Sequence, residues 1–160
     1  MEILQEVKQL DDEYFAIVGK NKPVAKKTFY IDGGCSNNSQ KDISRRKMVS
    51  VVCDEAGNVI YDISNEGGSN NIAELIALQY ALLWATTHKL DDIKIITDSK
   101  NTIAWYNSTK INRKINDYAR TSQIKKEIDL LEANIGKIEI EWRGREDNKA
   151  GHYIKNKYNL

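Results

Sequence analysis

The stretch Asn70-Asn71-Ile72-Ala73-Glu74-Leu75 lies where one sequence pattern gives way to another. Gly67-Gly68 interrupts a strand-like segment before it, and residues 72–87 carry apolar side chains at helical spacing after it. The stretch therefore predicts a turn that leads into a helix, with the carboxylate of Glu74 in the opening turn. Taken alone, such an acid is equally well explained as a capping-box or first-turn residue that the helix dipole favours.

Strand-like and helical segments alternate on both sides of this stretch. Strands are expected at Thr28–Ile31, Met48–Cys53, Asn58–Ile63, Ile93–Thr97 and Ile138–Trp142. Further helices are expected at Ser99–Tyr106, at Thr121–Ala133 and from Asp147 or Asn148 onward. The short turn between the second and third strands indicates a hairpin. This order predicts an α/β domain whose five-stranded mixed sheet combines an antiparallel three-strand meander with two parallel strands, flanked by helices.

Length and composition predict one domain, and they argue against a membrane protein. We assign residues 28–160 to the domain and expect residues 1–27 to be an N-terminal extension, either packed on the domain or a loose tail. The 24 basic and 23 acidic residues nearly balance, so net charge identifies no partner. No apolar run approaches the ~20 residues of a membrane span, and the acidic start is unlike a secretory signal. We expect a monomer in the cytoplasm.

Two further acids stand at the ends of predicted strands. Asp32 follows the first strand and Asp98 follows the fourth. If those strands are parallel neighbours, both carboxylates lie at the carboxyl edge of the sheet, and the helix can bring Glu74 to the same place. Three close carboxylates repel one another unless a cation lies between them, and oxygen ligands suit Mg²⁺ or Mn²⁺. Two such ions about 3.5–4 Å apart are what in-line phosphodiester hydrolysis uses.

Each of these two acids also has a local explanation. Asp32 precedes two glycines and could be a simple turn residue, since glycines let a backbone turn sharply. Asp98 could cap the helix that follows it.

Four blocks of the sequence resemble the type 1 ribonuclease H family. They are Phe29–Cys35, Ser69–Leu75, Ile96–Ser99 and Glu141–Asn148, and the second is the most specific. The resemblance covers roughly residues 28–158. It implies an RNase H-like fold and an endonuclease that hydrolyses the RNA strand of RNA/DNA hybrids. Such an enzyme uses two Mg²⁺ or Mn²⁺ ions and leaves 5′-phosphate and 3′-hydroxyl ends.

Two alternatives to a hybrid-cleaving enzyme stay open. The chain could be a catalytically silent nucleic-acid-binding domain with this fold, or a related nuclease that acts on DNA. The asparagine pair before Glu74 argues against the second, because a DNA nuclease has no 2′-hydroxyl to sense.

The resemblance also implies roles for individual residues. Asp32 would bridge both metal ions, and Glu74 and Asp98 would complete the second, with Glu74 also near the ribose 2′-hydroxyl. The 2′-hydroxyl distinguishes RNA from DNA, and side-chain amides suit it because each both donates and accepts. The positions assigned to substrate binding are the Cys35 backbone, Asn38, Asn70 and Asn71 along the minor groove, Ser69 at a DNA phosphate, Lys100 and Asn148.

The last helix departs from the family pattern. The family's fourth carboxylate stands four residues after an asparagine, and here the ungapped run from Asn148 places His152 in that position. One hypothesis is that His152 does the work, as a metal ligand or by holding the attacking water, with a bias toward Mn²⁺. A second is that Asp147 or Glu146 reaches the site from the preceding loop. A third is that the site is degenerate and the protein only binds.

A basic segment lies where many family members carry a handle for the hybrid. Lys110, Arg113, Lys114 and Arg120 would provide a sequence-independent and salt-dependent affinity for phosphates.

Overall fold

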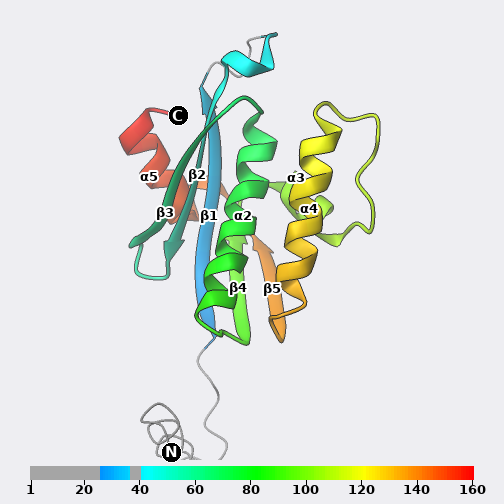
Figure 1. Ribbon diagram of the computed structural model, residues 1–160. Helices are drawn as coiled ribbons and strands as arrows, with labels where there is room; N and C mark the ends of the chain where they lie inside the picture. Colours follow the sequence, from blue (N-terminus) through cyan, green and yellow to red (C-terminus); the bar gives the residue numbers. More distant parts are fainter. Residues whose placement is uncertain (1–25, 37–40) are drawn as a thin grey trace, which may run out of the picture.

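The computed structural model describes residues 26–36 and 41–160. Within these residues five strands form one sheet, in the order β3-β2-β1-β4-β5. The strands are β1 (Lys27–Ser36), β2 (Lys47–Asp54), β3 (Val59–Glu66), β4 (Asp92–Thr97) and β5 (Lys137–Trp142). The pairs β1–β2 and β2–β3 are antiparallel, whereas β1–β4 and β4–β5 are parallel. The predicted mixed α/β sheet is therefore confirmed (Figure 1).

Helices cover both faces of the sheet. They are α2 (Asn70–Thr87), α3 (Lys100–Asn107), α4 (Tyr118–Glu132) and α5 (Lys149–Tyr158), with short 3-10 helices η1 (Ile43–Arg45) and η2 (Arg145–Asp147). The long helices α2 and α4 lie side by side on one face, and α5 lies on the other (Figure 1). No helix of residues 26–36 and 41–160 is long and apolar enough to span a membrane.

Side-chain alternation along β1 divides the core into two layers. Phe29 and Ile31 point into the larger layer, which the sheet forms with α2 and α4. Tyr30 points into the smaller layer, where it meets Ile96 of β4 and Ile154 of α5. Because both faces of the central strands are covered, Ile93, Ile95 and Ile96 of β4 are all buried, while the charged Asp92 and Lys94 of the same strand are only partly buried.

A position without a side chain in β1 decides where α2 packs. A Cβ atom on Gly33 would lie 2.4 Å from the carbonyl carbon of Ala73 and from the backbone nitrogen of Glu74. The strand and helix backbones are therefore in direct contact. The buried Ser50 hydroxyl of β2 donates a 2.6 Å hydrogen bond to the carbonyl oxygen of Ala73. These contacts hold the turn of α2 that carries Glu74 against β1.

Two details of the predicted local structure are wrong. β1 does not turn after Asp32 but continues to Ser36, with Gly33 and Gly34 paired opposite Ser50 and Val49 of β2. The glycine at 33 serves the close approach of α2 rather than a turn. The helix also begins earlier than predicted, at Asn70, because Ser69 accepts a hydrogen bond from the Ile72 backbone as the N-cap. Glu74 consequently lies in the second turn.

Some predictions fall on residues outside the described ranges. Residues 1–25, most of the expected N-terminal extension, and Asn38 are among them. The extension and the division of the chain at residue 27 therefore stay predictions.

The Gly33 contact predicts an unequal response to two neighbouring substitutions. Gly33→Ala should lower the free energy of unfolding by about 1–3 kcal/mol, because the new methyl group must displace the α2 backbone. Gly34→Ala is the matched control and should cost less, since its Cβ would meet side chains and no backbone: the flexible end of Leu160 at 3.2 Å, and Ile154 at an ordinary contact distance of 3.5 Å. Urea unfolding followed by circular dichroism measures both, and equal losses would contradict the proposed contact.

Candidate active site

Three acids converge at the carboxyl edge of the parallel strands. Tyr30 of β1 is paired with Ile96 of β4, and Asp32 and Asp98 each stand two residues beyond that pair. Glu74 reaches the same edge from α2, across Gly33. One oxygen atom from each of the three carboxylates lies within 4.8 Å of the others. The structure thus brings together the acids that the sequence placed on three separate elements.

The three carboxylates open onto a small polar hollow of about 290 Å³. Its lining residues are Asp32, Gly33, Gly34, Cys35, Asn70, Glu74, Asp98, Arg145 and Leu160. The volume falls just below the range of about 300–1,000 Å³ that is usual for small-molecule sites. A hollow of this size and lining suits ions and a phosphate group better than a bulky apolar ligand.

Burial and mutual repulsion make ionisation of the three acids costly. Burial, and then the charge of Asp98, raises the pKa of Asp32 from 3.8 to about 7. Burial raises the pKa of Glu74 from 4.5 to about 8, with the other two acids adding to the shift and a hydrogen bond from Ser99 opposing it. Burial also raises the pKa of Asp98. A cation bound at this place would therefore favour full ionisation of the three acids near neutral pH.

The donor set fits a hard divalent cation. All three candidate ligands are carboxylates, and oxygen-only ligands favour Mg²⁺, Mn²⁺ or Ca²⁺ over softer metals. A metal ion would also remove the electrostatic penalty that raises the three pKa values.

Sequence reasoning assigned no role to two residues of this site. Arg145 lines the hollow from η2, and its charge opposes the rise in the pKa of Asp32 and of Asp98. Its guanidinium donates a 2.8 Å hydrogen bond to the carbonyl oxygen of Leu160. Ser99 meets Glu74 while it caps α3 through the backbone of Thr102. Both residues lie inside blocks that resemble the ribonuclease H family, Ile96–Ser99 and Glu141–Asn148, and that position was the only sign in the sequence that they belong to the site.

Asn148 is an internal clamp at the start of α5. Its Oδ1 accepts hydrogen bonds from the backbone of Ala150 at 3.0 Å and of Gly151 at 3.3 Å, and its Nδ2 donates to the carbonyl oxygen of Ile31 at 2.9 Å. The residue is 0% exposed. These bonds tie α5 to β1 one residue before Asp32, and the predicted contact between Asn148 and substrate stays a prediction.

The fourth active-site position is less defined than the three acids. A Cβ on Gly151 would lie 3.1 Å from Oδ2 of Asp32, so the first turn of α5 lies directly against the acid cluster. His152 follows Gly151 in the helix, but its side chain is exposed. Among the described residues, neither His152 nor the exposed Glu146 and Asp147 joins the group whose ligand atoms lie within 4.8 Å of one another.

The predicted substrate-binding residues at the start of α2 divide between two hollows. Asn70 lines the acidic hollow, as does Cys35. Ser69 and Asn71 line a second hollow of about 380 Å³, together with Arg46, which donates a 3.1 Å hydrogen bond to the carbonyl oxygen of Gly68. The two neighbouring asparagines thus line different hollows: Asn70 lines the acidic hollow and Asn71 lines the second one.

Lys100 lies on a third element near the cluster. It is exposed at the start of α3, and its Nζ lies 5.3 Å from the centre of the Trp142 ring.

Comparison with solved structures places the fold among ribonucleases H. The RNase H1 of the halophilic archaeon Halobacterium salinarum has a TM-score of 0.62 and 17% identity, over 85% of this chain and 100% of that chain. The N-terminal RNase H domain of Rv2228c from Mycobacterium tuberculosis, fused to maltose-binding protein, has a TM-score of 0.60 and 19% identity, over 83% and 90%. LC11-RNase H1, solved in complex with an RNA/DNA hybrid, has a TM-score of 0.55 and 22% identity, over 77% and 88%.

The sequence itself matches a known family. No individual curated protein matches the chain. The family model described as RNase H matches residues 24–146, a range that includes all three clustered acids and ends before α5. Because this match covers most of the chain, the protein belongs to the RNase H family.

Proposed function

We propose that this RNase H family enzyme is a metal-dependent endonuclease that hydrolyses the RNA strand of RNA/DNA hybrids and leaves 5′-phosphate and 3′-hydroxyl ends. The observation that carries the proposal is the convergence of Asp32, Glu74 and Asp98 within 4.8 Å at one edge of the sheet. The family match supports the reaction class, and the hybrid bound to LC11-RNase H1 supports the substrate.

The three carboxylates would hold two Mg²⁺ or Mn²⁺ ions, with Asp32 shared between them. Ions bound there supply Lewis-acid stabilisation of the charge that develops on the phosphate. Asp32 lies within β1 and directly against the first turn of α5, so it is the residue best placed to be shared. Arg145 adds a positive charge to the same hollow, which favours a phosphodiester there.

Residues at the start of α2 would identify the RNA strand. Asn70 lies in the acidic hollow, where its amide can both donate to and accept from a ribose 2′-hydroxyl. Ser69, Asn71 and Arg46 line the second hollow, whose donors suit a phosphate of the DNA strand. This division supports a substrate with two chemically different strands.

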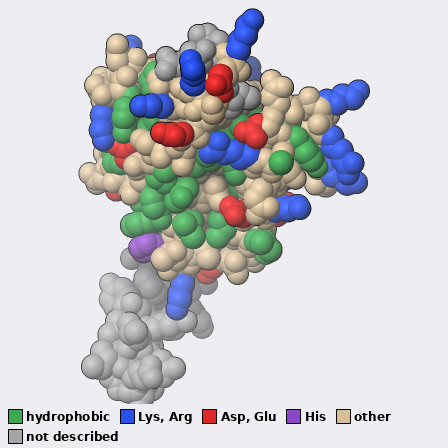
Figure 2. Space-filling view, turned by 45° about the horizontal axis from the view of Figure 1, so that its top comes forward, with side chains coloured by type: hydrophobic (Ala, Val, Ile, Leu, Met, Phe, Trp, Pro, Cys, Tyr) green, Lys and Arg blue, Asp and Glu red, His purple; other side chains and the backbone are tan. Residues whose placement is uncertain are grey.

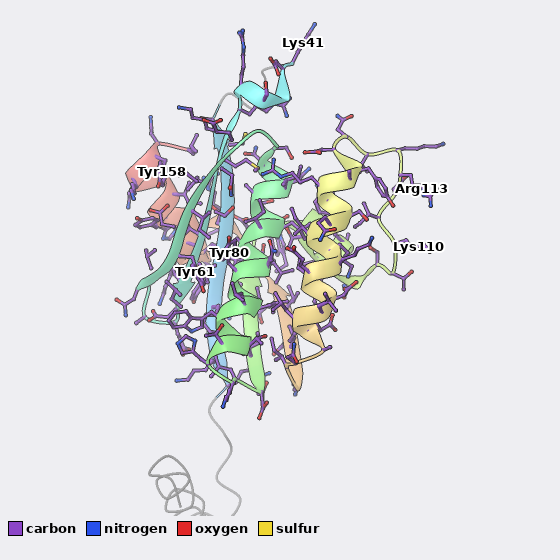
Figure 3. The ribbon with its side chains drawn as sticks, in the orientation of Figure 1. Lys41, Tyr61, Tyr80, Lys110, Arg113 and Tyr158 are labelled. Atoms are coloured by element: carbon purple, nitrogen blue, oxygen red, sulfur yellow. The ribbon has the colours of Figure 1, made fainter. Side chains whose placement is uncertain are left out.

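Basic side chains outside the hollows would add affinity without sequence preference. Figure 2 shows Lys and Arg side chains gathered around Asp and Glu side chains over the upper part of one face. Lys110 and Arg113 project away from the domain on the connection between α3 and α4 (Figure 3). Contacts of this kind depend on salt concentration because they release counterions from the nucleic acid.

For the fourth position we propose His152. It follows Gly151, whose backbone lies against Asp32. The backbone of His152 is therefore adjacent in the chain to the residue that touches the acid cluster. A second candidate function is a catalytically silent hybrid-binding domain. The observation that favours it is the exposed His152, outside the acid cluster, in the position where the resemblance leads one to expect a carboxylate.

The first prediction from the proposed function concerns the shared acid, Asp32. Asp32→Asn should lower kcat by about 100-fold or more, because loss of the bridging charge removes several kcal/mol of metal-dependent stabilisation. The matched control is Asp91→Asn, an exposed acid ahead of β4, which should cleave normally. Labelled RNA/DNA, DNA/DNA and RNA/RNA duplexes, with Mg²⁺, Mn²⁺ or a chelator, provide the assay. A wild-type protein that binds hybrids but cleaves no duplex would support the silent domain instead.

The second prediction separates the candidates for the fourth position. His152→Ala should lower kcat by about tenfold or more while thermal unfolding stays unchanged, because general acid–base groups contribute about 10²–10⁴-fold. Asp147→Ala should leave kcat within about twofold of the wild type. Loss of activity in the Asp147 variant alone would show that the assignment of position 152 is wrong.

The third prediction follows from the raised pKa values. An acid with a raised pKa holds its proton more tightly when folded, so its contribution to stability is complete below about pH 4 and is lost as pH rises through 7–8. Without divalent ions, the free energy of unfolding should therefore fall between pH 4 and 8, and Asp32→Asn should flatten that slope. Added Mg²⁺ should restore stability at pH 8 in the wild type. Urea unfolding measures the free energy of unfolding of both proteins at each pH. If it falls with the same slope in the wild type and in Asp32→Asn, this explanation is refuted.

A further inference from the structure

Trp142 ends β5 beside the acid cluster with much of its ring in water. It is 48% exposed, and its Nε1 donates a 3.1 Å hydrogen bond to the backbone carbonyl of Asp98. The backbone nitrogen of the next residue, Arg143, donates to the carbonyl oxygen of Thr97 at 2.9 Å. These two bonds hold the indole at a fixed place next to Asp98. The polar edge of the ring is satisfied within the protein, and the aromatic surface remains accessible.

A lysine lies beside the same ring. The Nζ of Lys100 is 5.3 Å from the centre of the indole, and Lys100 itself is exposed, two residues after Asp98. Both partners are therefore attached to the short segment that carries one of the three acids. An exposed aromatic surface with an adjacent cation suits a nucleotide, because the ring can stack on a base and the cation can pair with a phosphate.

Other exposed apolar side chains do not share these features. In the described ranges, the large hydrophobic residues that are clearly exposed are Val59, Leu83, Leu130 and Trp142. The first three are aliphatic, and single exposed aliphatic residues are common on proteins. Trp142 differs because its orientation is fixed by a hydrogen bond to the segment that carries an active-site acid.

We propose that Trp142 and Lys100 form a nucleotide subsite at the edge of the active site. The base of the RNA nucleotide next to the cleaved bond stacks on the indole, and the phosphate of that nucleotide pairs with Lys100. This inference rests on the proposed function, because it adds a contact to the same substrate. It gives the enzyme an additional substrate contact beside Asp98, the acid whose backbone carbonyl accepts the hydrogen bond from Trp142.

Binding measured without cleavage tests the subsite. In Asp32→Asn protein with Mg²⁺, adding Trp142→Ala should weaken the Kd for an RNA/DNA hybrid by about 5- to 100-fold, the range expected for one base–aromatic stack. Trp142→Phe, which keeps a ring but lacks Nε1, should stay within about threefold of the Asp32→Asn protein. Lys100→Gln should reduce the slope of log Kd against log salt by about one. Leu130 is an exposed apolar residue on α4, and Leu130→Ala is the matched control. It should change neither the Kd for the hybrid nor the dependence of Kd on salt.

Tryptophan fluorescence gives a second readout. Hybrid binding should quench emission in the Asp32→Asn protein and quench it less when Trp142→Phe is added, because a stacked base quenches the ring that it covers. Circular dichroism melts establish that each variant is folded.

The possible results distinguish the subsite from the function on which it rests. If neither the wild-type protein nor the Asp32→Asn protein binds any hybrid, the proposed function fails before Trp142 is changed. If it binds hybrid and Trp142→Ala leaves both Kd and quenching unchanged, the subsite is wrong. If Trp142→Phe and Trp142→Ala lower kcat equally in otherwise wild-type enzyme, with Kd unchanged, Trp142 only positions Asp98 and the subsite is overturned.

Discussion

The backbone contact between Gly33 of β1 and the Ala73–Glu74 segment of α2 is the constraint on which the site depends. Only a residue without a side chain lets the helix approach this closely, and the Ser50 hydroxyl holds the helix there. A helix displaced by one methyl group would carry the Glu74 carboxylate away from Asp32. From the opposite face, Asn148 ties α5 to β1 beside the same aspartate. Asp32 is therefore fixed by packing on both sides of the sheet.

That packing makes ionisation of the clustered acids costly, as is typical of functional sites. Two of the clustered acids are raised to pKa values of about 7 and 8, chiefly because burial removes the water that would stabilise their charges. Clustered like charges in a cleft weaken the fold unless something binds there, and such arrangements are typical of active sites. Arg145 and Ser99 offset part of this cost, while the remaining charge is left for a cation.

The order of the elements and the three acids could be predicted because each leaves a local signal. Alternation in strands, helical spacing after Asn70 and a single acid at each junction are all visible within a few residues. The contact at Gly33 leaves no such signal, so the glycines there read as a turn although the strand runs on to Ser36. The internal role of Asn148 leaves no local signal for the same reason, since its buried bond to Ile31 spans 117 positions of sequence. Arg145 stands among residues of both charges in the sequence, and only the fold of η2 places it in the hollow.

By itself the sequence determined the fold class, the element order and the identity of the acids, because hydrophobic periodicity and residue chemistry are local properties. The tertiary structure decided which groups share one space. It separated Asn70 from Asn71 into two hollows and placed Arg145 beside the acids. It also buried Asn148, left His152 exposed and fixed the Trp142 ring against Asp98. These outcomes depend on how distant segments pack, since side-chain direction and burial are set by neighbours that are remote along the chain.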